Sequence, residues 1–291
     1  MDWTPGGMSS DVEDRRGSSG GGFGFGGGGL GIIGFILLLV ISLVTGRNYI
    51  GAYLSGGGHV ATSTASNRPV NASPEEDRSA HLVSYVLDDV QKEWERLLPQ
   101  QTGQQYRRAK LVLFRDYTQS GCGVAQSQTG PFYCPADEKV YIDLGFWDEL
   151  RRLGGSTADF AQAYVLAHEL GHHVQNILGI ERQMRQLAAR NPSQQNPLSV
   201  RLELQADCLA GVWGNTAAQR GIIHQEDVED GLKAAAAVGD DHIQKMSRGA
   251  VSPESFTHGS SAQRQQWFTR GLQSGDVNRC NTFQDSGGGS F

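Results

Sequence analysis

The pattern of apolar and polar positions beyond residue 70 predicts a helix, two short strands and then a run of helices. Three acidic residues follow Pro74, and apolar residues recur at helical spacing from Leu82, which predicts a helix beginning at Pro74. The apolar run Leu111–Phe114 predicts a buried strand, and Lys139–Leu144 alternates like a half-buried strand. A small sheet followed by helices is the α+β pattern. Further helices are expected at 156–178, 180–190, 198–219, 226–247 and 260–273.

A glycine tract and a single apolar segment precede these elements. Ten of the fifteen residues from Gly17 to Gly31 are glycine, and such a low-complexity run cannot build a packed core. No charged residue lies between Arg16 and Arg47, and counting from 26 to 46 gives the ~20 residues that a helix needs to cross a bilayer. The expected organisation is a Gly-rich disordered N-terminus (1–25), a transmembrane helix (26–46), a flexible linker (47–73), a folded domain (74–285) and a disordered tail (286–291).

The apolar segment has two other interpretations. A buried core helix fits poorly between a glycine tract and a linker rich in Ser, Gly, Thr and Asn, and a cleaved signal peptide fits poorly because no A-x-A site follows. The lipid bilayer is therefore an expected partner. The orientation is open on charge alone, because Arg15 and Arg16 precede the segment and Arg47 follows it.

The four cysteines favour an oxidising compartment. Cys122 and Cys134 flank a loop of Gly, Ser and Pro that a disulfide could close, and Cys208 and Cys280 make the count even. Four free thiols in a cytosolic domain are the alternative. We expect a single-pass protein of the cell membrane, with its N-terminus in the cytoplasm and its folded domain on the periplasmic or extracellular side.

Charge and repeats exclude several classes of function. The formal net charge is −6 and no block of Lys and Arg occurs, so nucleic-acid binding has no electrostatic basis. Sustained heptads and repeats of 20–50 residues are absent, which excludes coiled coils and solenoids. We expect neither a nucleic-acid partner nor an organic cofactor.

The candidate chemistry lies in the stretch AHELGHHVQ, within the helix expected at 156–178. His168 and His172 are four residues apart, so their imidazoles project from one face and can hold one Zn²⁺. Glu169 points toward the open coordination position, where it can take a proton from a zinc-bound water. His173 lies about 100° round the helix from His172 and is expected to have a supporting or structural role. An amphipathic helix with surface histidines is the alternative.

A third zinc ligand is expected in the stretch RLELQADCLAG, on the helix at 198–219. Catalytic zinc commonly has three protein ligands and leaves the fourth position for water. Glu203 and Asp207 are four residues apart, so Glu203 can bind zinc while Asp207 accepts the free N–H of a ligand histidine. A pair of carboxylates on a solvated helix face is the alternative, although the neighbouring Leu and Ala residues indicate a buried helix.

These motifs resemble those of the gluzincin metallopeptidases, in which HExxH precedes E-x-x-A-D. The closer likeness is to the bacterial membrane proteins called neutral zinc metallopeptidases, the YpfJ-like family, and it covers nearly the whole chain. The stretches that carry it are VEDRR (12–16), GCG…YCPADEKVYIDLGFW (121–147), AHELGHHVQ, ELQADCLAG and SFTHGSSAQRQQWFTRGLQSGD (255–276). The resemblance implies a zincin-like fold, with His168, His172 and Glu203 as ligands and Glu169 as the catalytic residue.

The same resemblance suggests how a polypeptide would bind. In zincins the strand that borders the cleft pairs with the substrate backbone, and the last strand before the HExxH helix is Lys139–Leu144. Val140, Tyr141 and Ile142 are therefore expected to contact an extended substrate. His258 and Arg264 form a polar cluster downstream, in which His258 is expected to stabilise the oxyanion and Arg264 to bind substrate. A helix-capping turn with a surface histidine is the alternative for His258.

The sequence thus predicts a membrane-anchored zinc endopeptidase that uses one Zn²⁺ per chain. One alternative is a catalytically silent, membrane-tethered zinc protein that acts as a scaffold, but structural zinc usually has four protein ligands and no catalytic Glu. Another is a deformylase-like amidase, since GCGVAQSQTG (121–130) resembles the GxGLAAxQxG loop of peptide deformylases. Their third ligand is a Cys in an EGCLS stretch, which is absent between 130 and 168.

Overall fold

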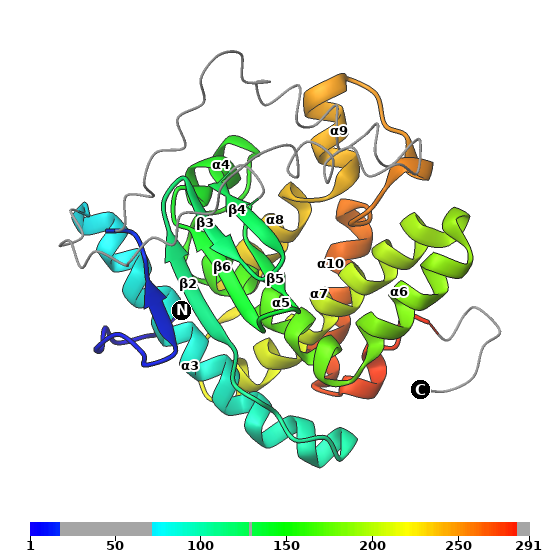
Figure 1. Cartoon of the computed structure of the whole chain (residues 1–291). Helices are drawn as coiled ribbons and strands as arrows, with labels where there is room; N and C mark the ends of the chain where they lie inside the picture. Colours follow the sequence, from blue (N-terminus) through cyan, green and yellow to red (C-terminus); the bar gives the residue numbers. More distant parts are fainter. Residues whose placement is uncertain (18–71, 128–129, 284–291) are drawn as a thin grey trace. The chain divides into compact units, whose positions relative to one another are not determined.

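A mixed sheet lies against a layer of helices in the computed structural model, which describes residues 1–17, 72–127 and 130–283 (Figure 1). The α+β class, with a small sheet and a helical bundle, is confirmed. Among the described residues no helix is both long and apolar enough to span a bilayer. The expected transmembrane helix (26–46), linker (47–73 apart from its last two residues) and tail (286–291) lie outside the described residues.

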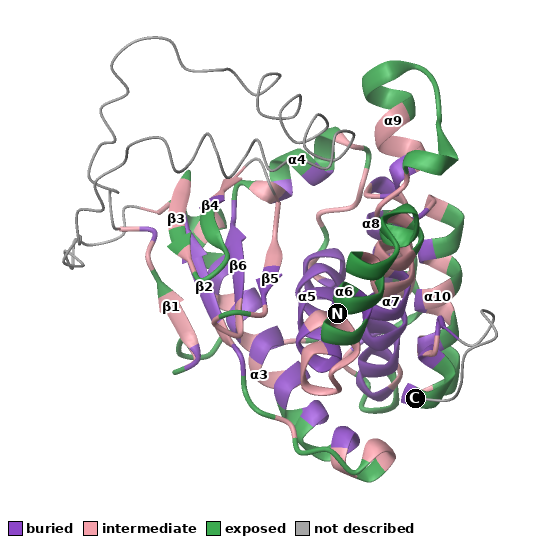
Figure 2. Cartoon of the chain, turned by 45° about the vertical axis from the view of Figure 1, so that its right-hand side comes forward, coloured by how far each residue is buried: buried purple, intermediate pink, exposed green. Residues whose placement is uncertain are grey.

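The main sheet has four strands in the order β1-β2-β6-β5. β1, β2 and β6 run parallel, whereas β5 is antiparallel to β6 and forms the edge of the sheet beside helix α5 (Figure 2). A separate hairpin, β3–β4, follows β2. The strand bounds are β1 Val12–Asp14, β2 Lys110–Phe114, β3 Tyr117–Ser120, β4 Gly123–Gln126, β5 Phe132–Cys134 and β6 Lys139–Asp143.

This order corrects the expected substrate-binding strand. β6 is paired with β2 on one side and with β5 on the other, so it has no free edge for a peptide. Its residues Val140, Tyr141 and Ile142 are at most 1% exposed and belong to the core. The expectation that they contact substrate is wrong. The three-residue strand β5 pairs with the edge of β6 that was expected to bind a peptide.

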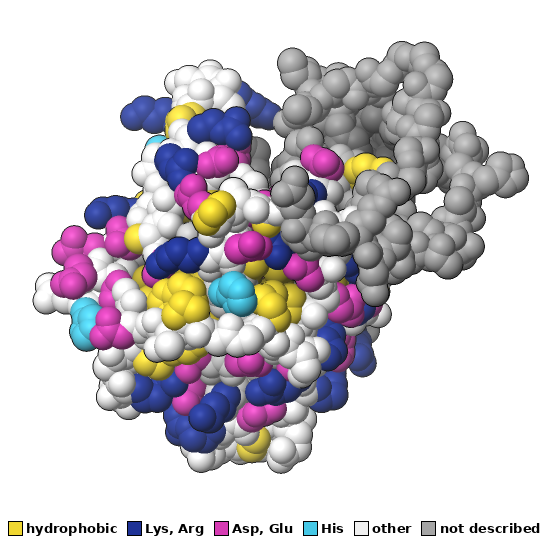
Figure 3. All heavy atoms as spheres, turned by 90° about the vertical axis from the view of Figure 1, so that its left-hand side faces the viewer, with side chains coloured by type: hydrophobic (Ala, Val, Ile, Leu, Met, Phe, Trp, Pro, Cys, Tyr) yellow, Lys and Arg dark blue, Asp and Glu magenta, His cyan; other side chains and the backbone are white. Residues whose placement is uncertain are grey.

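The N-terminal residues are also more ordered than expected. Residues 1–17 lie within the described part of the chain, and Val12, Glu13 and Asp14 pair with Leu111, Val112 and Leu113 of β2. Lys and Arg side chains alternate with Asp and Glu on the face seen in Figure 3. Ion pairs tie this segment to other elements, among them Lys139–Glu13 at 2.6 Å and Arg16–Glu76 at 3.3 Å. The expected disordered N-terminus is therefore wrong for residues 1–17.

The helices follow the predicted pattern closely, with one break. The helix expected at 226–247 is two helices, α8 and α9, separated at Gly239. A Cβ atom at Gly239 would lie 2.5 Å from the backbone nitrogen of Ser261, so only glycine allows this approach of the two segments. The short helix α4 was not expected. The bounds are α3 Pro74–Thr102, α4 Phe146–Arg152, α5 Asp159–Ile177, α6 Ile180–Arg190, α7 Gln195–Gln219, α8 Gln225–Ala237, α9 Asp240–Arg248 and α10 Ser261–Ser274.

Two of these helices, α7 and α10, lie in direct backbone contact. A Cβ atom at Gly271 of α10 would lie 1.9 Å from the carbonyl oxygen of Cys208, and one at Gly211 of α7 would lie 2.1 Å from that of Phe268. The disulfide Cys208–Cys280 closes the same interface. Glycine thus lets α10 approach α7 closely enough for their polar side chains to meet.

Both expected disulfides are present. Cys122 in the turn of the β3–β4 hairpin is bonded to Cys134 at the end of β5, and Cys208 of α7 is bonded to Cys280. The chain's four cysteines are thereby all oxidised. The first disulfide fastens the hairpin to the edge strand of the sheet, and the second fastens the C-terminal residues to the helix that carries Glu203.

Candidate metal centre

Helices α5 and α7 bring together the three expected zinc ligands. His168 and His172 lie one turn apart on α5, and Glu203 faces them from α7. Oε2 of Glu203 lies 3.2 Å from Nε2 of His168, and its Oε1 lies 3.6 Å from Nε2 of His172. Tetrahedral ligands at about 2.0–2.1 Å from zinc are separated by roughly 3.4 Å. The ligand atoms of the three side chains all lie within 4.8 Å of one another, close enough for one zinc ion to bind them together.

The outer nitrogens of both histidines have acceptors that fix their tautomers. Nδ1 of His168 donates to Oδ1 of Asp207 at 2.8 Å, as expected for Asp207. Nδ1 of His172 donates to Oε1 of Gln175 at 2.8 Å, and Gln175 in turn donates to the carbonyl oxygen of Leu202 at 2.7 Å. Both Nε2 lone pairs are left for a metal, as in metal sites whose outer partners orient the ligands.

Gln175 was not identified from the sequence. It lies three residues after His172 and so on the same side of α5, which is the signal that could have found it. By bonding the backbone of α7 directly before Glu203, it ties the two ligand-bearing helices together.

Asp207 is also the centre of a buried ionic cluster. Nε of Arg264 donates to its Oδ2 at 2.8 Å and Nη2 to its Oδ1 at 2.9 Å, and the hydroxyl of Tyr164 donates to the same carboxylate. Asp207 is completely buried and Arg264 is 4% exposed. Burial alone would raise the pKa of the Asp207 carboxyl, but Arg264 and then His168 lower that pKa to about 2.

This cluster corrects the role expected for Arg264. Its guanidinium is committed to Asp207 and to the carbonyl oxygen of Val238, at 3.3 Å, and is buried between α7 and α5. It therefore supports the partner of a ligand histidine, and the expected contact with substrate is not supported by its position.

Glu169 occupies the face of α5 next to the ligand histidines. It is 8% exposed and follows His168 by one residue, which turns it about 100° round the helix. Glu169 and His173 are four residues apart and share a face of α5, on which His173 contacts β5 through Tyr133. Glu169 is thus next to the ligand His168 along the helix and on the same side of α5 as His173, which contacts β5.

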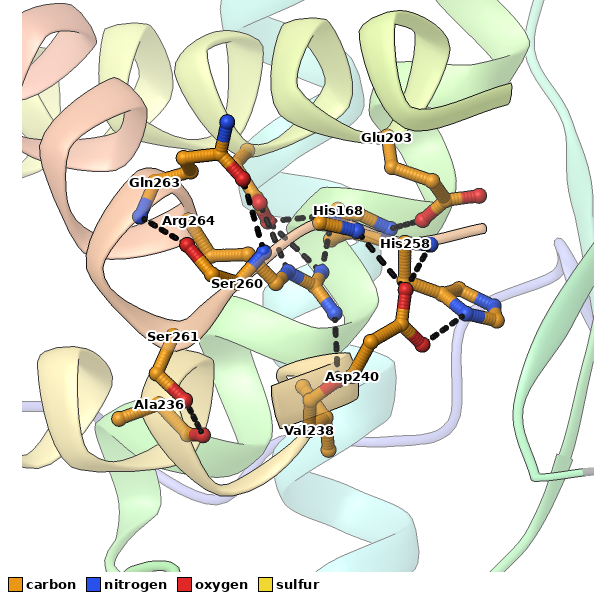
Figure 4. A network of polar contacts seen from close by, with 12 residues as sticks. His168, Glu203, Ala236, Val238, Asp240, His258, Ser260, Ser261, Gln263 and Arg264 are labelled. Atoms are coloured by element: carbon orange, nitrogen blue, oxygen red, sulfur yellow. Dashed lines mark hydrogen bonds and ion pairs between the residues drawn. The ribbon is translucent and has the colours of Figure 1, made fainter. Parts of the chain in front are cut away.

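His258 is held by a loop that Asp240 organises (Figure 4). Oδ2 of Asp240 accepts the backbone N–H groups of Thr257, His258 and Gly259 at 2.7, 2.6 and 3.0 Å, and its Oδ1 lies 3.2 Å from Nδ1 of His258. The imidazole is 52% exposed. Contact of the remaining half of the imidazole with the protein lowers the pKa of His258, but the hydrogen bond to Asp240 and the charge of Glu203 outweigh this and raise the pKa.

His258 is therefore not the capping residue of the helix that follows it. The helix cap of α10 is Ser260, whose hydroxyl accepts from the backbone of Gln263, so His258 is not needed for capping. Asp240, whose role could not be recognised from the sequence, holds Nδ1 of His258 and leaves its Nε2 for another partner. Figure 4 shows His258 in the same polar network as His168 and Glu203.

Comparison with known proteins agrees with this geometry. The family model described as "Putative neutral zinc metallopeptidase" matches residues 1–283. The chain belongs to this family. The protein YpfJ of Escherichia coli strain K12 is 47% identical over 292 residues, which cover 98% of this chain and 100% of YpfJ. The Mycobacterium tuberculosis protein Rv2575 is 45% identical over 207 residues, 67% of this chain and 68% of its own length. No solved structure matches the chain.

Membership in a zinc metallopeptidase family supports zinc as the cofactor and a polypeptide as the substrate class. In the described structure the candidate zinc site is the cluster of His168, His172 and Glu203, whose ligand atoms all lie within 4.8 Å of one another.

Proposed function

We propose that the chain is a zinc-dependent endopeptidase. The observation that carries the proposal is the convergence of Nε2 of His168, Nε2 of His172 and the Glu203 carboxylate, with Glu169 directly beside them. Zinc held there would act as a Lewis acid and lower the pKa of a coordinated water. The Glu169 carboxylate would accept the proton that is released and pass it to the leaving amine.

The substrate would bind along β5 instead of β6. β1 and β5 are the two edge strands of the described main sheet, and of these β5 lies beside the helix that carries the two ligand histidines (Figure 2). Its free edge offers backbone N–H and C=O groups to an extended chain. Because such hydrogen bonds involve the backbone, selectivity for sequence is expected to be loose.

The alternatives are less well supported. Structural zinc takes four protein ligands, whereas the described residues supply three and a neighbouring Glu. A deformylase-like site needs a cysteine thiolate as third ligand, and all four cysteines are bound in disulfides. Disulfides persist in oxidising compartments, so we also propose that the domain works outside the cytoplasm.

Removal of the metal tests the proposed function directly. The zinc-loaded full-length chain is expected to cleave unfolded β-casein at internal peptide bonds, which mass spectrometry of the products identifies. Incubation with a chelator should abolish cleavage, and stoichiometric zinc should restore it, because the water and the carbonyl are activated only at the metal. Equal cleavage with and without chelator would refute a zinc peptidase.

His258 is expected to act in the transition state. Because Nδ1 of His258 donates to Asp240, Nε2 can donate only when the imidazole is protonated, which its raised pKa favours. The protonated Nε2 would then donate to the oxyanion that forms as the peptide bond is attacked, and loss of such a donor typically lowers kcat by ~10²–10³. His258→Ala should therefore lower kcat by that factor, change KM little and leave the zinc content unchanged. The measurement is steady-state kinetics on a quenched fluorescent peptide built on a β-casein cleavage site. An unchanged kcat would restrict His258 to a role in the structure of the loop.

A further inference from the structure

A ring of polar contacts surrounds His173, the third histidine of the HELGHH stretch. Nε2 of His173 lies 2.6 Å from the carbonyl oxygen of Arg107, and its Nδ1 lies 2.9 Å from the hydroxyl of Tyr133 on β5. A carbonyl oxygen only accepts, so Nε2 carries the proton and Nδ1 accepts from Tyr133. His173 is completely buried, and among the described residues its hydrogen-bond partners are the Arg107 carbonyl and the Tyr133 hydroxyl, so both ring nitrogens are satisfied.

The ring continues through the turn that joins β5 to β6. Nδ2 of Asn176 donates to the Tyr133 hydroxyl at 3.0 Å and lies 3.5 Å from Oε1 of Glu138, which pairs with the Arg107 guanidinium at 2.7 Å. Glu138 adopts a left-handed backbone conformation with a φ of 56° in that turn. The contacts thus form a closed circuit from the segment before β2, through the β5–β6 turn, to α5 and back.

This circuit holds the edge strand against the face of α5 that carries Glu169. Glu169, His173 and Asn176 are four and three residues apart, so they form one row along the helix. Tyr133 is the residue of β5 that contacts this row. Its side chain is therefore the link between the free edge of the sheet and the row that begins with Glu169.

We propose that His173, through Tyr133, is a positioning residue that fixes the height and register of β5 relative to Glu169 and the ligand histidines. The inference rests on the proposed function and deepens it, because it assigns substrate affinity to a buried circuit that does not touch substrate. A peptide paired with β5 presents its scissile bond at a point set by that strand. A shift of β5 weakens the pairing of every substrate in the same way, before and during the reaction.

Tyr133→Phe tests the link with little change in volume. It removes one hydroxyl and leaves Nδ1 of the buried His173 without a donor. KM for the quenched fluorescent peptide is expected to rise about 5- to 10-fold while kcat stays within about 3-fold, the pattern of lost uniform binding. The matched control is Tyr106→Phe. Tyr106 packs edge-on against the same imidazole, with ring centroids 5.3 Å apart, but its hydroxyl donates to Gln91 at 3.3 Å, away from β5.

Substitution of His173 itself separates positioning from packing. His173→Gln keeps one donor and one acceptor and should keep KM near that of the wild type, whereas His173→Phe fills the space without hydrogen bonds and should match Tyr133→Phe. Equal KM values for the Tyr133→Phe and Tyr106→Phe proteins, with lower thermal stability in both, would overturn the inference and leave the circuit a purely structural role.

A binding measurement keeps this test independent of turnover. Fluorescence anisotropy with dye-labelled, unfolded β-casein, which requires no known cleavage site, and the zinc-loaded Glu169→Gln protein should give a Kd that Tyr133→Phe raises about 5- to 10-fold and Tyr106→Phe does not. Lack of hydrolysis by the wild type, with this Kd difference intact, would refute the proposed function and uphold the positioning role. The same Kd in all three proteins would overturn the positioning role whatever the activity.

Discussion

Replacing Glu169 by Gln is expected to lower kcat by about 10²–10⁴-fold, the range that a general base contributes, while zinc binding is retained. The amide has nearly the shape of the carboxylate but cannot accept the proton. Glu169 does not belong to the cluster of ligand atoms, which consists of His168, His172 and Glu203. Metal analysis of the purified protein should therefore give about one zinc per chain, and steady-state kinetics on the β-casein peptide should give the rate.

Glu203→Ala provides the contrast. It removes one of three ligands and should lose both zinc and activity, whereas Glu169→Gln loses activity alone. Wild-type zinc affinity in Glu203→Ala would show that Glu203 is not the third ligand. Wild-type kcat in Glu169→Gln would show that the proton is taken elsewhere.

The second large effect is expected for Asp207→Ala, which should lower the free energy of unfolding by about 3–5 kcal/mol. Removing one partner of a buried ion pair leaves the other charge without compensation, and that is the range such changes cost. Here the remaining charge is the Arg264 guanidinium, which is 4% exposed. Zinc affinity should also fall by about 10–100-fold, because His168 loses the acceptor of its Nδ1–H. Urea unfolding in the presence of a chelator isolates the first effect from the second.

Two controls accompany this measurement. Asp148→Ala breaks an ion pair with Arg151 in which both side chains are more than half exposed, and should cost at most about 1 kcal/mol. The double variant Asp207→Ala, Arg264→Ala removes both buried charges and should be less destabilised than the sum of the single variants. An Asp207→Ala protein as stable as Asp148→Ala would contradict the importance of the cluster. If Asp207→Ala does not fold, Asp207→Asn keeps the volume and one acceptor and should show a smaller loss in the same direction.

Much of the site could be predicted because helix geometry fixes it locally. Residues four apart share one face of any α-helix, so His168 and His172 had to face the same way once the helix was predicted. The expected helix at 156–178 corresponds to α5, Asp159–Ile177. Glu203 and Asp207 follow the same rule on α7. Spacing does not dictate that they meet α5. The meeting was expected because catalytic zinc commonly needs a third protein ligand, and the order of the motifs, which resembles a known family, supported it.

What could not be predicted depends on contacts between distant segments. β5 has three residues, too few to show a period, and its pairing decides that β6 is internal. Arg264 was assigned to substrate because nothing in its own stretch, THGSSAQRQQWF, shows that glycine allows α10 to approach α7. Asp240 and Gln175 were missed for the same reason. Each forms hydrogen bonds with backbone groups of a segment distant in the sequence, the loop at 257–259 for Asp240 and Leu202 for Gln175.

The pairing of β1 also bears on membrane topology. β1 lies in the same sheet as β2, and Arg16 directly after it lies 3.3 Å from Glu76 of α3, so the residues before the glycine tract and those after residue 72 lie on one side of any bilayer. A single crossing between them would place the two strands in different compartments. The completed sheet and the expected single-pass arrangement, with its N-terminus in the cytoplasm and its domain outside, therefore exclude each other in one molecule.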